Sequence, residues 1–221
     1  PMKKYILPYC ILIALVLAAC NKNNERHIPI DADVLANFNY KVGTYWIYRD
    51  SLSGQVDSFY VSGNSGNIPS EINGVVYDEI SFYVLQTNIN SISGNDLVTW
   101  LFGLTTNYLS LGLQVIKNGQ LDRIDFTTFI TYPFTLGQPL PKYFGGGVRG
   151  ANVISILPCY TLNTKSYANV AVLDIIDSLP QYNFNDQFLI NADVGIIKMK
   201  LNHANDGLLR VWELERSVIV K

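Results

Sequence analysis

Apolar and polar residues alternate along much of the chain, so that every second side chain is hydrophobic. A two-residue period is typical of strands that bury one face in a core. Together with β-branched and aromatic content, the pattern predicts strands near residues 42–48, 56–61, 75–87, 124–132, 152–162, 168–177, 197–201 and 209–219. No segment keeps the period of a long helix. The sequence therefore predicts a mainly β fold of antiparallel sheets, arranged as a sandwich or as a curved, half-barrel-like sheet, with little helix after the N-terminal segment.

Two of these strands have a well-defined apolar face, which we expect to lie in the core. The side chains on these faces are Val76, Ile80, Phe82 and Val84 in one strand and Trp212, Leu214 and Val218 in the other. Turn residues predict hairpins at Ser51–Gly54, at Asn118-Gly119 and at Asn205–Gly207. Short strands joined by such turns favour antiparallel neighbours.

Two segments are less well defined. Within residues 96–116, Asp96 could cap a short helix, whereas Gly103 and Gly112 favour strands. Residues 133–150 contain three prolines and five glycines. This second segment is a candidate boundary between two β subdomains, or a long crossover.

The N-terminal segment has the three parts of a secretory signal peptide. Two lysines precede an apolar run from Tyr5 to Ala19, which is shorter than the about 20 residues that a membrane-spanning helix needs. The run ends in Leu17, Ala18, Ala19 and Cys20, which resembles the lipobox of bacterial lipoproteins. The resemblance implies cleavage before Cys20, a diacylglycerol thioether on the Cys20 sulfur, and a fatty acyl chain such as palmitate on its amino group.

We therefore expect three regions: a signal peptide over residues 1–19, a lipidated Cys20 with a polar tether over residues 20–38, and a β-rich domain over residues 39–221. Two or three acyl chains anchor a protein durably to a bilayer, so the expected location is the cell envelope, at the outer membrane. Asn21 to Glu25 resembles the export tag of surface lipoproteins and fits a solvated tether at least as well. Periplasmic and surface-facing orientations both stay open.

Several strand and turn motifs resemble those of uncharacterised Bacteroidetes-type envelope lipoproteins. They are Tyr40–Tyr48, Tyr132–Gly137, Asp193–Lys198 and Val211–Leu214. The resemblance spans most of the expected mature chain and implies a β architecture and an envelope location. It carries over no catalytic residue, because every one of these motifs is structural.

Composition narrows the expected partners. Fourteen Tyr and ten Phe against 15% charged residues favour strands. A net charge of −2 without a basic stripe argues against nucleic acid as a partner.

Once Cys10 is removed and Cys20 is lipidated, Cys159 has no cysteine left for an intrachain disulfide. The apolar run around Cys159 predicts a small, buried side chain.

No motif predicts a catalytic, cofactor or metal site. His27 and His203 have no carboxylate or second histidine at ligand spacing in the sequence. Glu213 and Glu215 share a strand face, where they either flank a sugar or cation or form a solvated surface with neighbouring arginines. The solvated surface is the favoured interpretation.

Two tripeptides resemble the Asp-Ser/Thr-apolar sequon for O-glycosylation in Bacteroidetes envelope proteins. They are Asp50-Ser51-Leu52 and Asp177-Ser178-Leu179. Ser51 and Ser178 are therefore candidate acceptors, and both fall near expected turns or strand ends.

The favoured function is a non-enzymatic, membrane-anchored binding or scaffold module. One alternative is a carrier that holds a lipid or another apolar molecule in a pocket lined by Phe, Leu and Ile. Another is a surface glycan-binding protein, which needs exposed Trp or Tyr rings. A hydrolase would have to gather distant carboxylates or His203 into one pocket, and is the least favoured.

Overall fold

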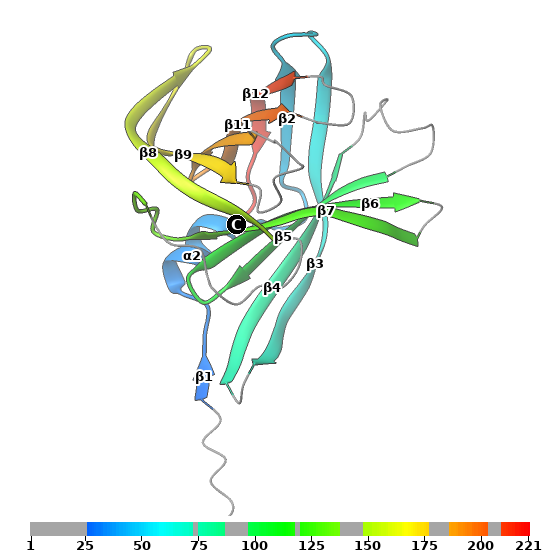
Figure 1. Cartoon of the computed structure of the whole chain (residues 1–221), viewed down its shortest axis with the longest axis vertical. Coiled ribbons are helices and arrows are strands. Elements are labelled where there is room, and N and C mark those ends of the chain that lie inside the picture. Colours follow the sequence, from blue (N-terminus) through cyan, green and yellow to red (C-terminus); the bar gives the residue numbers. More distant parts are fainter. Residues whose placement is uncertain are drawn as a thin grey trace, which may run out of the picture.

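The protein is described by a computed structural model (Figure 1), and its described residues form one helix and twelve strands. The described residues are 26–72, 75–86, 97–117, 120–137, 148–176, 186–202 and 209–221. The helix is α2, Ala32–Phe38. The strands are β1 (Arg26–Ile28), β2 (Tyr45–Asp50), β3 (Val56–Ile72), β4 (Val75–Gln86), β5 (Leu97–Thr105), β6 (Tyr108–Lys117), β7 (Gln120–Thr131), β8 (Val148–Leu162), β9 (Lys165–Ile176), β10 (Asp186–Asn191), β11 (Gly195–Asn202) and β12 (Leu209–Val218). The prediction of a mainly β fold is confirmed.

All strands belong to one strongly curved sheet. Its order is β1-β4-β3-β2-β12-β11-β10-β9-β8-β7-β6-β5, and β5 also pairs with β4. This last pairing brings the two ends of the sheet together, so the sheet is barrel-shaped and nearly closed. Neighbours are antiparallel, except in the two short parallel ladders β1–β4 and β7–β8. Of the two predicted architectures, the curved sheet is the one observed.

Most of the predicted apolar side chains line the interior, while Val76 and Ile80 of β4 are half-buried. Phe82 and Val84 of β4 are fully buried, and so are Trp212 and Leu214 of β12. Val218 is 43% exposed instead. The pairing of β12 with β2 shifts between Leu214 and Arg216, and such a bulge moves every later side chain to the opposite face.

The ambiguous segment 96–116 forms strands. β5 and β6 pair along their full length, from Leu97 opposite Ile116 to Thr105 opposite Tyr108. Thr106 adopts a positive φ in the turn between them. The Asn118-Gly119 turn lies outside the described residues, and β6 and β7 on its two sides are antiparallel neighbours, as expected.

The sequence predicts a polar tether over residues 20–38, whereas the structure includes residues from Arg26 onward in the fold. β1 pairs with β4, and α2 buries Val34 and Phe38 in the core. Asp31 caps the helix by accepting a hydrogen bond from the Asp33 N–H at 2.8 Å. A spacing of four residues places both buried side chains on one helix face. The seven-residue helix is too short for its period to be recognised in the sequence.

Residues on both sides of the 133–150 segment share one sheet and one hydrophobic core. β8 begins within this segment and forms a long, curved hairpin with β9 (Figure 1). Cys159 lies in the distal half of that hairpin and is exposed. The prediction of a buried Cys159 is wrong: its side chain is exposed, as are those of Ile154 and Ile156, whereas the neighbouring Tyr160 packs against the core.

Candidate functional site

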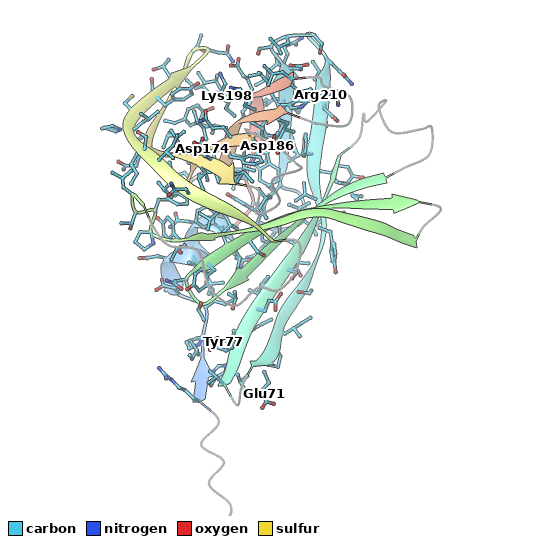
Figure 2. The ribbon with its side chains drawn as sticks, in the orientation of Figure 1. Glu71, Tyr77, Asp174, Asp186, Lys198 and Arg210 are labelled. Atoms are coloured by element: carbon cyan, nitrogen blue, oxygen red, sulfur yellow. The ribbon has the colours of Figure 1, made fainter. Side chains whose placement is uncertain are left out.

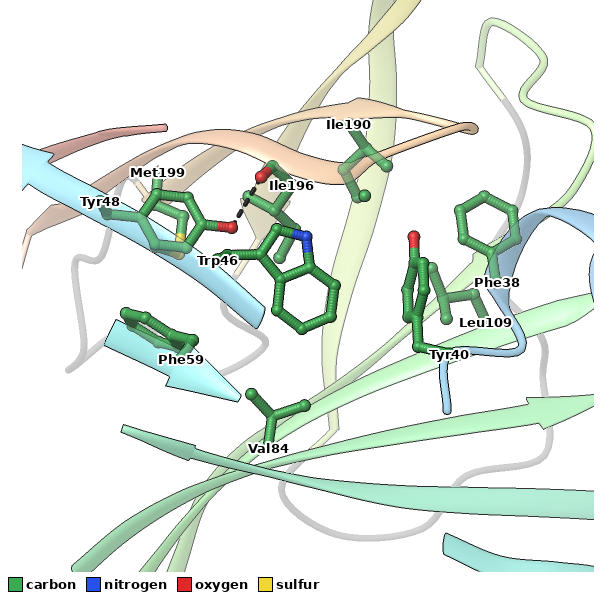
Figure 3. A pocket seen from close by; sticks show the side chains of 11 residues that line it. Phe38, Tyr40, Trp46, Tyr48, Phe59, Val84, Leu109, Ile190, Ile196 and Met199 are labelled. Carbon is green, nitrogen blue, oxygen red and sulfur yellow. Dashed lines mark hydrogen bonds between the residues drawn. The ribbon is translucent and has the colours of Figure 1, made fainter. Parts of the chain in front are cut away.

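Aromatic side chains fill the interior of the sheet next to α2 (Figure 3). The Tyr40 and Trp46 rings meet edge to face, with centroids 5.0 Å apart, as do those of Tyr48 and Phe59. Together with Phe38 they surround a cavity of about 20 Å³. A cavity of this size holds about one water molecule. It offers no room for the lipid that the carrier hypothesis requires.

Two of the buried aromatic residues donate hydrogen bonds to backbone carbonyls in the β10–β11 turn and at the start of β11, whereas the third, Tyr40, does not. Trp46 Nε1 donates to the Val194 carbonyl and the Tyr48 hydroxyl donates to the Ile196 carbonyl, each at 2.7 Å. The Tyr40 hydroxyl is buried and has no hydrogen-bond partner among the described residues. Burial raises the pKa of Tyr40, and the charge of Asp193 raises it further. Tyr40 is therefore neutral at all physiological pH values.

The turn between β10 and β11 packs closely against these rings. Gly195 has a φ of +95°, a conformation that residues with a side chain rarely adopt. A Cβ atom at this position would lie 2.8 Å from the Tyr40 hydroxyl oxygen. Glycine is thus required both by the backbone and by the close approach of Tyr40.

An open groove lies on the outer side of the same turn, between residues 165–168 and 191–194. Its volume is about 470 Å³, which is within the range of small-molecule sites. Both an exposed cation and an exposed anion line it, Lys165 and Asp193. This groove is the candidate binding site.

Asn191 fixes the shape of the groove. Its side chain is buried; its Nδ2 donates to the Ala168 carbonyl at 2.8 Å. Its Oδ1 accepts from the N–H groups of Asp193 and Val194 at 3.1 and 3.2 Å. One amide therefore ties the first residues of β9 to the β10–β11 turn. A groove that is already ordered loses little conformational entropy when it binds a ligand.

Of the lipobox and glycosylation residues predicted from sequence, Ser51 is the one within the described part of the chain. It is exposed on the turn between β2 and β3, so a glycosyl group could reach its hydroxyl. Buried Asp50 holds this turn by accepting hydrogen bonds from the Ser53 hydroxyl and from the N–H groups of Leu52 and Val211. Burial acts to raise the pKa of Asp50, but these hydrogen bonds outweigh it and hold the pKa below its usual value. Leu17, Ala18, Ala19, Cys20, Ser178 and His203 lie outside the described residues.

Glu213 and Glu215 are paired with cations on neighbouring strands. Lys198 Nζ lies 2.6 Å from a Glu213 carboxylate oxygen, and Arg49 Nε lies 2.5 Å from one of Glu215. The sequence suggested the neighbouring arginines of β12 as partners, whereas the cations in these two ion pairs come from β11 and β2. Their charges are thus compensated across strands, which disfavours a cation site at this pair.

The structure also brings together residues that the sequence keeps apart. His27 Nε2 lies 2.9 Å from an Asp78 carboxylate oxygen, across the β1–β4 ladder. The glycan hypothesis requires exposed Trp or Tyr rings. Trp46 and Trp212 are buried, whereas Tyr60 and Tyr83 are exposed. Among the described residues, no three His, Cys, Asp or Glu side chains gather as the ligands of a metal ion would.

Sequence reasoning missed the groove. The signal available for it was the polar turn Asn191–Gly195 between two apolar strands, but nothing in the sequence placed residues 165–168 beside it.

No helix in the described part of the chain has the length and hydrophobicity to span a bilayer. No protein-family model, curated protein or solved structure matches this chain.

Proposed function

We propose that this chain is a lipid-anchored protein of a bacterial cell envelope, at the outer membrane, and that its β fold is a non-enzymatic binding or scaffold module. The anchor is supported by the lipobox-like sequence Leu17–Cys20. The position of Cys20 in the chain also supports an anchor, because the described fold begins at Arg26, shortly after Cys20. A fold that starts so close to the anchor belongs on the membrane surface.

The observation that supports a binding role is the groove held by Asn191. Its charged walls suit a polar ligand, whereas the apolar cavity beside Tyr40 is too small for a lipid. We therefore favour a polar ligand, such as an oligosaccharide or a peptide, over an apolar one. The Asn191 amide is engaged by its three protein hydrogen bonds. The charged side chains that line the groove for recognition are therefore Lys165 and Asp193.

Binding is tested by titrating panels of oligosaccharides and charged peptides into the mature chain, with calorimetry as the readout. Lys165→Gln combined with Asp193→Asn is expected to weaken binding about tenfold or more, because each charged hydrogen bond contributes about 1.5–3 kcal/mol. The matched control is Lys200→Gln, an exposed lysine on β11, which is expected to leave the affinity unchanged. Equal affinities for the groove variant and the control would contradict the assignment of the groove.

The anchor is tested by the intact mass of the protein isolated from the membrane fraction of its host. The mass is expected to match a chain that begins at Cys20 and carries a diacylglyceryl group with an additional acyl chain. Cys20→Ala is expected to abolish this added mass and to prevent cleavage at the lipobox. Cys159→Ala, which changes an exposed cysteine in β8, should keep it. Retention of the lipid mass by Cys20→Ala would refute the anchor.

A further inference from the structure

The distance between the proposed anchor and the folded sheet is short. Arg26 lies opposite Val75 and Ile28 opposite Tyr77 in the parallel β1–β4 ladder. Arg26 follows Cys20 by six residues, which span at most about 22 Å when fully extended. The start of β1 must therefore stay within that distance of a lipid attached to Cys20.

The start of β1 lies beside the tip of the β3–β4 hairpin. β3 ends at Ile72 and β4 begins at Val75, so the tip adjoins Arg26 (Figure 1). Figure 2 shows Glu71 and Tyr77 at this end of the molecule. The opposite end of β3 carries the turn of residues 51–55. With seventeen residues in β3 and about 3.3 Å per residue, the two ends are roughly 50 Å apart.

The outer face of this hairpin end carries apolar and amphipathic side chains next to one acidic residue, Glu79, which lies opposite Ile68. Ile28 and Tyr77 are direct neighbours on it, and Ser70 lies opposite Tyr77. Ile68, two residues before Ser70, points to the same face and is 51% exposed. Arg26 is exposed on the same side of β1 as Ile28. Tyrosine and arginine side chains each combine an apolar part with a polar end, which suits them to the boundary between headgroups and acyl chains.

We propose that, in the lipid-anchored protein, this hairpin end is a membrane-facing surface and the Ser51 turn points away from the bilayer. The proposal rests on the lipid anchor proposed for Cys20. The anchor supplies the affinity, whereas the short tether and the Ile68–Tyr77–Arg26 face set the orientation. A glycosyl group on Ser51 would then project away from the membrane, where it does not compete with the headgroups.

The test attaches the mature Cys159→Ser chain by the Cys20 thiol to a maleimide-bearing phospholipid in vesicles of phosphatidylethanolamine and phosphatidylglycerol. A photoreactive benzoyl-phenylalanine replaces either Ile68 or Leu52. Both are exposed aliphatic residues, at 51% and 60%, and they lie near opposite ends of β3. After irradiation, mass spectrometry measures the fraction of protein crosslinked to lipid.

We expect at least about fivefold more lipid adduct at position 68 than at position 52. Inserting twenty Gly/Ser residues after Asn24 adds an r.m.s. length of about 25 Å and should reduce the adduct at position 68. Equal yields at the two positions, or a higher yield at position 52, would overturn the proposal. Because the lipid is attached chemically, the result does not depend on whether the host lipidates Cys20, which the intact mass decides separately.

Discussion

Phe38→Ala is expected to lower the free energy of unfolding by about 3–5 kcal/mol. Phe38 is fully buried, and its ring meets those of Tyr132 and Phe134 edge to face, with centroids 5.1 and 6.0 Å apart. Truncation removes both contacts and enlarges the cavity that Phe38 helps to line. Urea denaturation followed by tryptophan fluorescence measures the loss.

Leu35→Ala on the same helix is the matched control, because Leu35 is half-buried and alanine is favourable in helices. Its expected cost is about 1–2 kcal/mol. If Phe38→Ala cost no more than this control, α2 would not be part of the core. The interpretation of residues 20–38 as a tether would then hold after all.

Gly195→Ala is expected to cost about 2–5 kcal/mol, from two sources. The positive φ adds about 1–2 kcal/mol for a residue with a Cβ atom, and overpacking a filled interior adds about 1–3 kcal/mol. The overpacking arises because the new Cβ would lie 2.8 Å from the Tyr40 hydroxyl oxygen. The melting temperature and the urea midpoint both report the effect.

Two further variants separate these sources. Gly54 has a φ of +75° with no atom within 4 Å of a new Cβ, so Gly54→Ala measures the backbone cost without a clash. Tyr40→Phe removes the hydroxyl that the Gly195 substitution would strike, and should recover part of the loss in the double variant. By itself Tyr40→Phe is expected to be neutral or slightly stabilising, since a buried hydroxyl without a partner is unfavourable. A double variant as unstable as the sum of the single variants would contradict the clash.

Alternation in the sequence was sufficient to predict the strands, because a two-residue period records which face each strand buries. It correctly placed Phe82, Val84, Trp212 and Leu214 in the core. It was wrong for Val218, because a bulge at Glu215 adds one residue to β12 opposite β2. A bulge of this kind depends on the partner strand and leaves no mark in a single strand's pattern.

The candidate site was beyond the reach of sequence reasoning, because it depends on residues that are distant in the chain. Asn191 binds the Ala168 carbonyl, and Arg49 pairs with Glu215. Such contacts follow from strand order and register. Neither is fixed by the local pattern when a sheet has twelve strands and a nearly closed shape. The short helix α2 was missed for a related reason, since two buried residues in seven are too few to define a period.

The parallel pairing of β1 with β4 has a mechanical consequence for the proposed anchored protein. Tension applied at Cys20 pulls along the axis of β1 and loads its three residue pairs with β4 together, in shear. The next attachment is at Asp31, whose N–H donates to the Thr106 carbonyl at 2.7 Å. If β1 detached while α2 stayed packed, the reach from Cys20 to the fold at Ile30 would grow from about 22 Å to about 36 Å. The folded domain would then have two possible maximum distances from the bilayer, the shorter with β1 paired to β4 and the longer with β1 detached.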